Sequence, residues 1–417
     1  MDPIFHRPKL ALEMAQLLLR PSSLETRFRS GLFISAPRQT GKSTFLIQDL
    51  IPILESAGAI VIYVDLWEAK GKTPEQKLLR AAQNKLTDLQ GKDPRSFAAK
   101  AAGLLRNIGL SSAEVEAAIE PSVHLAKAKI GGKIKLGFDT ATVGEGGESI
   151  SDALKEVSKK TGRDIVFIVD EVQDLMLDGH GILLMKELKA TRDAINMQHG
   201  DHGYFLFVGN GSNRSMVHEM TAQRRSPFYG AQNLPFPTLG RDYVRHALAF
   251  ERHRNAKVLL PSESAAHTGM RVLGNKPNLF QEALSILQRS KEADGNNDAV
   301  FEGIVNTLYD QEGKVEFEKL EMLGELPQVV FARICQGPPE GVTGLYADDA
   351  RTEYAKALGW DKVTKREVQS ALDSMKSSGL ILREGDHKPV KAADEFMREI
   401  WIRRHEHGEE PGRQATA

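Results

Sequence analysis

The strongest constraint on this chain is an apolar run that leads into a Gly-Lys-Ser turn. Residues 32–46 read LFISAPRQTGKSTFL, so the turn has the spacing A-x-x-x-x-G-K-S and a helical pattern follows it. This order of strand, turn and helix is typical of a phosphate-binding loop, with Ala36 where the strict pattern has glycine. Successive backbone N–H groups of such a loop surround a polyphosphate at a helix N-terminus, where the dipole favours anions. The pattern predicts a nucleotide site; the alternative is a Gly-Lys-Ser turn that arose by chance.

The residue types in this loop fit the chemistry of a nucleotide with a divalent cation. Gly41 lets the backbone approach the phosphates closely, Lys42 reaches the β- and γ-phosphates, and the Ser43 hydroxyl binds Mg²⁺. We therefore predict ATP and Mg²⁺ as cofactors. The residues expected to bind ATP are Ala36, Pro37, Arg38, Gln39, Thr40, Gly41, Lys42, Ser43 and Thr44.

Length and composition limit the class of protein to which this chain can belong. A chain of 417 residues with 41% hydrophobic and 27% charged residues is typical of a globular protein with two or three domains. The single cysteine, Cys335, excludes a disulfide within the chain and a cysteine-built zinc site. We see no signal-peptide pattern and no apolar run near the roughly 18 residues of a membrane span, so we expect a cytoplasmic protein without membrane contact. The net charge of −1 gives no argument for nucleic acid.

A second buried run ends in two acids. Residues 165–171 read IVFIVDE, which is the pattern of a strand in the interior of a parallel sheet. Such a strand carries its last residues to the carboxyl edge of the sheet, where open α/β sheets bind ligands. We expect Asp170 to orient Mg²⁺ and Glu171 to polarise the attacking water. The alternative is an ordinary strand that ends in a solvated acidic turn.

A third buried run, residues 204–210, ends in a polar side chain. Asn210 is our candidate for holding the attacking water near the γ-phosphate, with Ser212 and Asn213 as rivals. The alternative is structural, because Gly-Asn-Gly is a strong turn sequence and Asn210 could serve the turn alone.

Two arginines follow this strand. Arg224 and Arg225 stand immediately before Ser-Pro-Phe-Tyr-Gly, and either could reach the nucleotide of a neighbouring subunit as an arginine finger. This would require a homo-oligomer. The alternative is a pair of solvated surface charges.

The periodicity predicts helices and strands of an α/β core over residues 1–240. Pro52 should kink or end the helix that follows the phosphate-binding loop. Residues 74–148 interrupt the core: residues 74–128 look helical, and the glycine-rich residues 131–148 suggest a hairpin or mobile loop. The other elements expected are helices at 8–20, 150–160 and 181–197 and strands at 31–36 and 59–66.

The C-terminal half divides into two further units. Residues 241–325 form a predicted helical lid, with a candidate linker at 294–298. Residues 326–404 show three helical patterns and two short strands, which together predict a winged helix; we expect a disordered tail at 405–417. Residues 351–417 contain 13 Lys or Arg and 12 Asp or Glu, a net +1, so DNA binding and protein contact both remain open for this unit.

The order of the phosphate-binding loop, Asp170-Glu171, Asn210 and the Arg225-Ser-Pro-Phe-Tyr-Gly segment resembles the AAA+/STAND-type ATPases. The motifs are most similar to the archaeal-type ATPase clade related to origin-recognition ATPases. The resemblance implies a parallel sheet, a helical lid, a C-terminal winged helix, and ATP hydrolysis coupled to conformational change. It also implies that Gly274 and Pro277 approach the nucleotide from the lid. No clear lid arginine is present, so Lys276 or Arg271 would have to substitute.

These observations predict a Mg²⁺–ATP-dependent ATPase that acts as a conformational switch, with a protein partner. One alternative is a DNA-associated ATPase that loads or remodels a nucleoprotein complex through residues 326–404. Another is an interaction module that binds nucleotide with little hydrolysis, against which the Asp170-Glu171 pair argues. A small-molecule kinase shares the loop, but the adjacent acids and the winged helix disfavour it.

Overall fold

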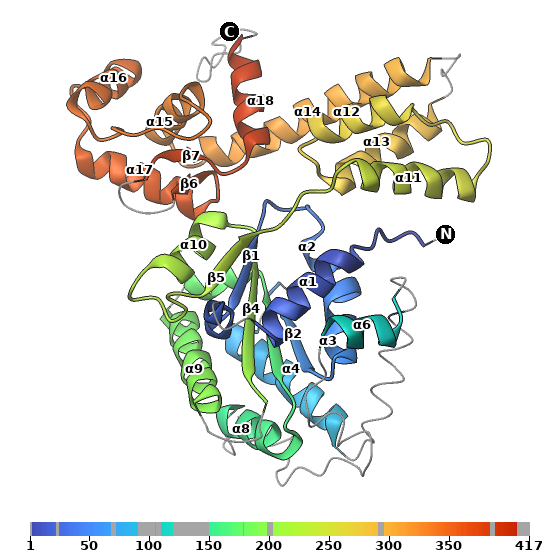
Figure 1. The fold of residues 1–417 in the computed structure, drawn as a ribbon. Helices are drawn as coiled ribbons and strands as arrows, with labels where there is room; N and C mark the ends of the chain where they lie inside the picture. The colour runs from blue at the N-terminus through green and yellow to red at the C-terminus, as the bar shows by residue number, and fades with distance from the viewer. Residues whose placement is uncertain are drawn as a thin grey trace.

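The computed structural model of the chain describes residues 2–21, 25–67, 72–90, 105, 110–119, 150–177, 179–197, 203–290, 296–383 and 388–406. A sheet-containing part holds the N-terminal elements, and helices α11 (Arg241–Arg254) to α18 (Glu395–Glu406) form a second part that lies over one end of it (Figure 1). Among the described helices, none combines the length and the apolar character that crossing a membrane requires.

Five parallel strands form the central sheet, which confirms the predicted α/β class. Their order is β2-β3-β4-β1-β5, and neighbouring strands pair in register, for example Asp170 beside Asn210 and Asn210 beside Ile34. The carboxyl ends of β1, β3 and β4 therefore meet at one edge. The strands are β1 Leu32–Ser35, β2 Ile60–Asp65, β3 Ile165–Asp170, β4 Phe205–Gly211 and β5 Gln232–Pro235.

Helices bury both faces of this sheet, which explains why its inner strands are continuous apolar runs. Along β3, Ile165, Phe167 and Val169 pack on one face, and Val166 and Ile168 pack on the other. Helices α4 Pro74–Leu89, α8 Ile150–Thr161, α9 Gly179–Asn196 and α10 Arg214–Ala222 cover the first face. Helices α1 Pro8–Leu19, α2 Lys42–Phe45, α3 Ile51–Ser56 and α6 Ser112–Ala118 cover the second (Figure 1). Short 3₁₀ turns lie at Thr26–Ser30 and Val172–Met176.

Capping explains where the two described helices of the 74–148 segment begin. Thr73 and Gln76 form a reciprocal capping box at the start of α4, and Ser111 and Glu114 form another at the start of α6. The predicted glycine-rich hairpin or loop at 131–148 lies outside the described residues.

The helix after the phosphate-binding loop does not end at Pro52, which was one of the two outcomes predicted there. It continues to Ser56, with a wider π-helical turn at Leu46–Leu50 between α2 and α3. Such a turn changes the backbone hydrogen-bond spacing just before the proline, which has no N–H to donate and whose ring needs extra room.

The lid consists of α11 Arg241–Arg254, α12 Glu263–Val272, α13 Pro277–Arg289 and α14 Asn297–Glu321. Asn296 caps α14 through its side chain, which accepts a hydrogen bond from the N–H of Ala299 at 3.3 Å. The candidate linker at 294–298 therefore overlaps a helix, because its last two residues, Asn297 and Asp298, already belong to the first turn of α14.

The winged helix is present as predicted, with one added element. It contains α15 Glu325–Gln336, α16 Asp348–Leu358, α17 Lys365–Ser377, and the antiparallel strands β6 Ile381–Arg383 and β7 Val390–Ala392. A further helix, α18 Glu395–Glu406, includes the first two residues of the expected tail at 405–417; the rest lies outside the described residues.

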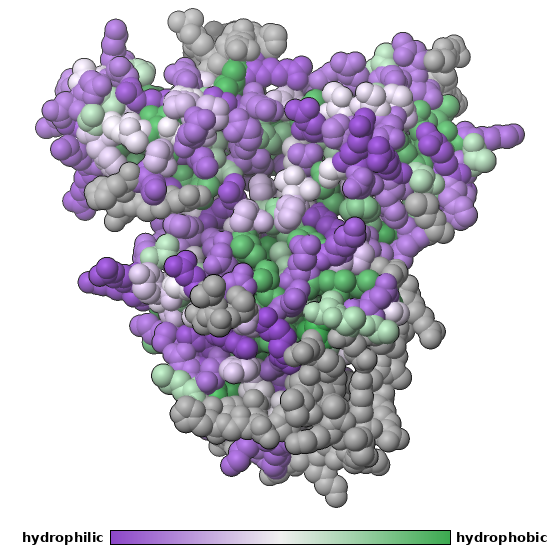
Figure 2. Space-filling view, viewed as in Figure 1, coloured by the Kyte–Doolittle hydropathy of each residue, from purple (hydrophilic) through white to green (hydrophobic). Residues whose placement is uncertain are grey.

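One hydrophobic core runs through the lid and the winged helix. Phe301 of α14, Phe331 of α15 and Ile400 of α18 belong to the same buried cluster. The two units thus share their packing rather than meeting across a solvated surface. Most residues on the visible face of this part are hydrophilic, and apolar residues show near its junction with the sheet-containing part (Figure 2).

Candidate nucleotide-binding site

The Gly-Lys-Ser segment forms a tight loop between β1 and α2. Gly41 has φ +83° and Gln39 has φ +62°, so the chain passes twice through the left-handed region before the helix begins at Lys42. Within the loop, the Thr40 hydroxyl donates to the carbonyl of Pro37 at 2.9 Å. Glycine is suited to its position because it adopts positive φ without steric cost. Ser43 and Thr44 follow in the first turn of α2, with exposed side chains.

The Lys42 side chain folds back over this loop. Its ammonium donates to the carbonyls of Ala36 at 2.9 Å and Pro37 at 2.8 Å, and the residue is only 6% exposed. Burial lowers the pKa of Lys42 from 10.5 to about 8, and the nearby carboxylates of Glu171 and Asp170 partly oppose this change. The loop therefore holds a buried cation close to two acids.

Asp170 lies at the end of β3 and is 1% exposed. Its Oδ2 accepts a hydrogen bond from the Tyr63 hydroxyl at 2.8 Å. Its Oδ1 accepts from the backbone N–H of Glu171 at 2.9 Å and from the side-chain amide of Asn210. These three donors come from β2, from the residue after β3 and from β4, so the carboxylate is fixed at the carboxyl edge of the sheet.

Glu171 is the first residue after β3 and has φ +54°, an uncommon conformation for a residue with a side chain. Its Oε2 accepts from the Ser212 hydroxyl at 2.7 Å and from the amide of Gln173. Strained backbone of this kind is often found at functional sites. The carboxylate is thus held between the end of β3 and the segment that follows β4.

The three rival residues after β4 have different partners. Asn210 is buried and contacts Asp170, while its Oδ1 has no hydrogen-bond partner among the described residues. Ser212 contacts Glu171. Asn213 caps α10 through the N–H of Met216 at 3.1 Å, so it does not face the acids.

Sequence reasoning missed two residues of this cluster, Tyr63 and Gln173. Tyr63 lies within β2, two residues before its end, and Gln173 lies in the 3₁₀ turn after Glu171. The sequence offered only a faint signal for either: a tyrosine in an otherwise aliphatic strand, and a glutamine next to the acids.

Arg224 and Arg225 are not part of this cluster. Both are exposed and lie past the end of α10, whose nine residues carry the chain about 13 Å away from the end of β4. Phe228, in the following turn, stacks on Phe207 with ring centroids 4.3 Å apart, which anchors the turn to the sheet. The two arginines therefore lie outside the group of residues that the structure brings together at the phosphate-binding loop.

On the lid side, Lys276 lines a cavity that two residues of the phosphate-binding loop also line, and Arg271 does not. A cavity of about 230 Å³ between the two parts of the molecule is lined by Pro37, Arg38, Gln173, Ser212 and Lys276, among others. Lys276 is 6% exposed and forms an ion pair with Glu312 at 2.8 Å. Arg271 is exposed and does not line this cavity.

Pro277 is the first residue of α13 and also does not line the cavity. Gly274 turns the chain toward it with φ +66°, and a Cβ there would lie 3.0 Å from the ring of Phe396. The Gly274 turn therefore brings the lid close to α18, and Lys276 is the residue of this turn that lines the cavity.

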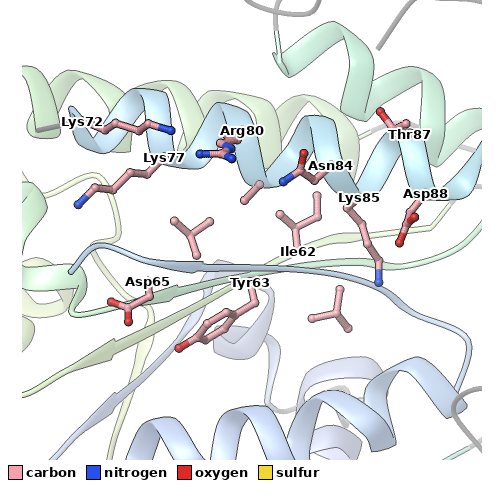
Figure 3. A pocket seen from close by; sticks show the side chains of 13 residues that line it. Ile62, Tyr63, Asp65, Lys72, Lys77, Arg80, Asn84, Lys85, Thr87 and Asp88 are labelled. Carbon is pink, nitrogen blue, oxygen red and sulfur yellow. The ribbon is translucent and has the colours of Figure 1, made fainter. Parts of the chain in front are cut away.

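A cavity larger than this one lies elsewhere in the described part of the chain, between β2 and α4. It measures about 670 Å³ and is lined by residues such as Ile62, Asp65, Arg80 and Lys85 (Figure 3). Lys85 is paired with Glu55. Since no residue of the phosphate-binding loop and neither Asp170 nor Glu171 lines it, its size does not make it the candidate site.

The donor set at the sheet edge fits a magnesium ion that keeps some of its waters. Mg²⁺ prefers oxygen ligands and is commonly bound by one or two protein groups together with phosphates and water. Asp170 and Ser43 supply such oxygens, and the unpartnered Oδ1 of Asn210 could accept from a water near them. The described residues contain no group of three or more His, Cys, Asp or Glu arranged to hold a metal by themselves.

Neither a family model nor a curated protein matches this sequence. Among solved structures, the chain is similar to the ORC2 protein of Aeropyrum pernix in ADPNP–ADP complexes, with 14% identity, 96% of each chain covered and a TM-score of 0.48. It is also similar to the Aeropyrum pernix ORC1 protein in complex with DNA, with 16% identity, 96% and 94% coverage and a TM-score of 0.39. A third match is Cdc6p from Pyrobaculum aerophilum, with 11% identity, 96% and 94% coverage and a TM-score of 0.31. These are origin-recognition ATPases, the group that the motifs resemble, but at such low identity and TM-score the likeness adds nothing to a functional argument.

Proposed function

We propose that this chain binds Mg²⁺–ATP at the carboxyl edge of its sheet, hydrolyses it, and changes conformation as it does so. One observation carries the proposal: a buried lysine in a phosphate-binding loop lies close to Asp170 and Glu171 at the carboxyl end of β3, which β4 separates from β1. A structural role alone gives no reason to bury this lysine, because burial disfavours its charged form.

Each group then has a defined part. The loop from Ala36 to Thr44 surrounds the phosphates, Lys42 contacts the β- and γ-phosphates, and Ser43 and Asp170 hold Mg²⁺. The cation neutralises charge on the phosphates during transfer. Glu171 takes the proton of the attacking water.

Asn210 supports this arrangement through its contact with Asp170. Its amide donates to Asp170, which leaves the buried Oδ1 as an acceptor for a water at the site. A buried oxygen without a partner is costly, and a water that donates to it would relieve that cost.

The lid contributes from the opposite side. Lys276 lines the same cavity as Pro37 and Arg38, and Pro277 starts the helix that follows Lys276. ATP between the sheet and the lid would set their relative angle, and loss of the γ-phosphate would release it.

Replacing the proton acceptor tests this proposal. The Glu171→Gln variant keeps the shape of the side chain but cannot accept the proton, so we expect it to bind ATP normally and to release phosphate at least about a hundredfold more slowly. Asp170→Asn is the companion variant and should weaken the Mg²⁺ dependence instead. Phosphate release by Glu171→Gln at the wild-type rate would reject the assignment; ATP binding without turnover in the wild type would favour a nucleotide-binding interaction module.

DNA binding through the winged helix is a second candidate function, favoured by one observation. Lys362, Lys365 and Arg366 are exposed around the N-terminus of α17, the third helix of this unit. Fluorescence anisotropy with labelled duplex DNA tests it: affinity should fall steeply with salt, and Lys365→Glu with Arg366→Glu should abolish it. Unchanged anisotropy would leave the winged helix as a protein-contact module.

A further inference from the structure

Helix α10 connects the nucleotide site to the winged helix. Asn213, at its start, donates from Nδ2 to the carbonyls of Lys376 at 3.0 Å and Ser377 at 3.3 Å, both at the end of α17. Its Oδ1 meanwhile caps α10. One amide thus fixes the start of this helix and docks the winged helix on it.

Two further residues of α10 strengthen this docking. Ser215 is 1% exposed; its hydroxyl donates to the carbonyl of Ile381 at 2.8 Å and accepts from the N–H of Arg383 at 3.3 Å. One turn later, Glu219 forms an ion pair with Lys376. Residues four apart lie on one face of a helix, so Ser215 and Glu219 present a continuous polar surface to α17 and β6.

The residue before this surface contacts the proposed proton acceptor. Ser212 donates to Oε2 of Glu171 at 2.7 Å and is adjacent to Asn213 in the chain. Gln173 donates to the same oxygen. The short segment from Ser212 to Ser215 therefore binds Glu171 at one end and the winged helix at the other.

From this juxtaposition we infer that docking of the winged helix on α10 restrains Glu171, and that undocking releases it for hydrolysis. The inference rests on the proposed function, because it assigns a regulatory input to the same site. Ser212 is the positioning residue, and Asn213 and Ser215 sense whether the winged helix is docked.

The direction of the effect follows from the orientation of the carboxylate. Ser212 and Gln173 both donate to Oε2 of Glu171, and these two bonds fix the plane of the whole carboxylate. Oε1 keeps its lone pairs, but a proton acceptor held in this way is less able to turn toward a water. When the winged helix leaves, the segment from Ser212 to Ser215 loses its contacts with α17 and β6. The population then shifts toward a Glu171 that has lost the bond from Ser212 and keeps the bond from Gln173.

The variant Asn213→Asp separates docking from capping. Aspartate keeps the oxygen that caps α10 and removes the amide that donates to the carbonyls of α17. Asn296→Asp is the matched control, because it makes the same change at the exposed cap of α14, far from this contact. Ser212→Ala removes the other end of the connection directly.

Two measurements on the full chain follow these variants. Energy transfer between dyes on Leu183→Cys in α9 and Lys356→Cys in α16 reports docking; both positions are exposed, while the native Cys335 is buried. Phosphate release and ATP affinity report the site. We expect Asn213→Asp to increase the dye separation and raise kcat about threefold or more at unchanged ATP affinity, with Ser212→Ala raising kcat alone.

The outcomes are separable. Equal kcat in wild type, Asn213→Asp and Asn296→Asp, with undocking seen by energy transfer, would overturn the inference and leave the proposed ATPase intact. A fall in kcat for Ser212→Ala would also overturn it, because Ser212 would then assist Glu171. Turnover that appears only after undocking would support it strongly, and no turnover in any variant would remove both the inference and the ATPase.

Discussion

The sheet edge and the lid contribute to the same site in different ways. At the edge, Lys42, Asp170 and Glu171 sit at positions that strand burial and loop geometry dictate locally. In the lid, Lys276 reaches the cavity through a turn at Gly274 and an ion pair with Glu312, which lies 36 residues away. The comparison teaches that chemistry placed at strand ends is fixed by the backbone, whereas the contribution of the lid depends on tertiary packing.

The largest effect is expected at the edge, from Lys42→Ala. This variant removes the cation that the loop supplies to the β- and γ-phosphates, so ATP binding should fall below detection in calorimetry. Circular dichroism should show an intact fold, because within the described part of the chain the lysine ammonium hydrogen-bonds to two loop carbonyls. Unchanged ATP affinity in the folded variant would contradict the proposal that ATP binds at the carboxyl edge of the sheet.

The next effect lies outside both regions, at Arg224 and Arg225. An arginine finger that completes a site in trans contributes about 10³ to 10⁵ in rate. If either residue acts in this way, Arg225→Ala or Arg224→Ala should bind ATP normally and lose hydrolysis. Arg225 is our first choice because it stands next to the turn that Phe228 anchors.

A mixing experiment tests the trans arrangement. Combining Arg225→Ala with Lys42→Ala should restore activity, since one subunit supplies the finger and the other the intact loop. If the two variants co-assemble, as judged by light scattering, and the mixture stays inactive, the arginines are surface charges.

The same contrast explains what the sequence could predict. The inner strands and the phosphate-binding loop follow from local signals: apolar runs, Gly41 and the adjacent acids at the end of β3. Strand β5 was not predicted, because Gln232–Pro235 is short and polar and lies at the edge of the sheet. Its pairing with β1 identifies it as a strand. Helix α18 escaped because its polar sequence becomes a helix face only through burial of residues such as Ile400 against α14.

The polar residues near Asp170 and Glu171 also show how far sequence-based prediction can go. Asn210, Ser212 and Asn213 look equivalent in sequence, yet one contacts Asp170, one contacts Glu171 and one caps α10. Asp170 and Glu171 lie 40 and 41 residues before their partners Asn210 and Ser212, and Asn213 also contacts Lys376 of the winged helix, 163 residues away. No local pattern encodes these tertiary contacts. The sequence can predict that the polar residues at the end of a strand belong to the site. Which role each of them has can be assigned only from tertiary contacts.

A smaller effect should come from pH, through the lowered pKa of Lys42. Below about pH 8 the ammonium is charged and attracts phosphate; above it the side chain loses its proton, and ATP affinity should fall up to about tenfold per pH unit. Binding above pH 8 should take up a proton, which calorimetry in buffers of different ionisation enthalpy detects. Because the unfolded chain keeps this proton up to 10.5, Lys42 should also make the free energy of unfolding rise with pH between about 8 and 10.5. A flat affinity profile from pH 7 to 9 would contradict the buried, charged state of the lysine.

The smallest effect is expected in the lid, from Lys276→Met. The cavity that Lys276 lines includes Pro37 at the start of the phosphate-binding loop and Ser212 beside Glu171, so its charge should act on the terminal phosphate more than on the rest of the nucleotide. We expect ATP affinity to fall about threefold to tenfold while ADP affinity stays the same, measured by calorimetry. Glu312→Gln is the control, because it breaks the ion pair but keeps the cation; it should lower thermal stability as Lys276→Met does and leave the ratio of ATP to ADP affinity unchanged. Equal loss of both nucleotides in Lys276→Met would instead assign the lysine to packing of the lid alone, and the sheet edge would then supply all the phosphate recognition.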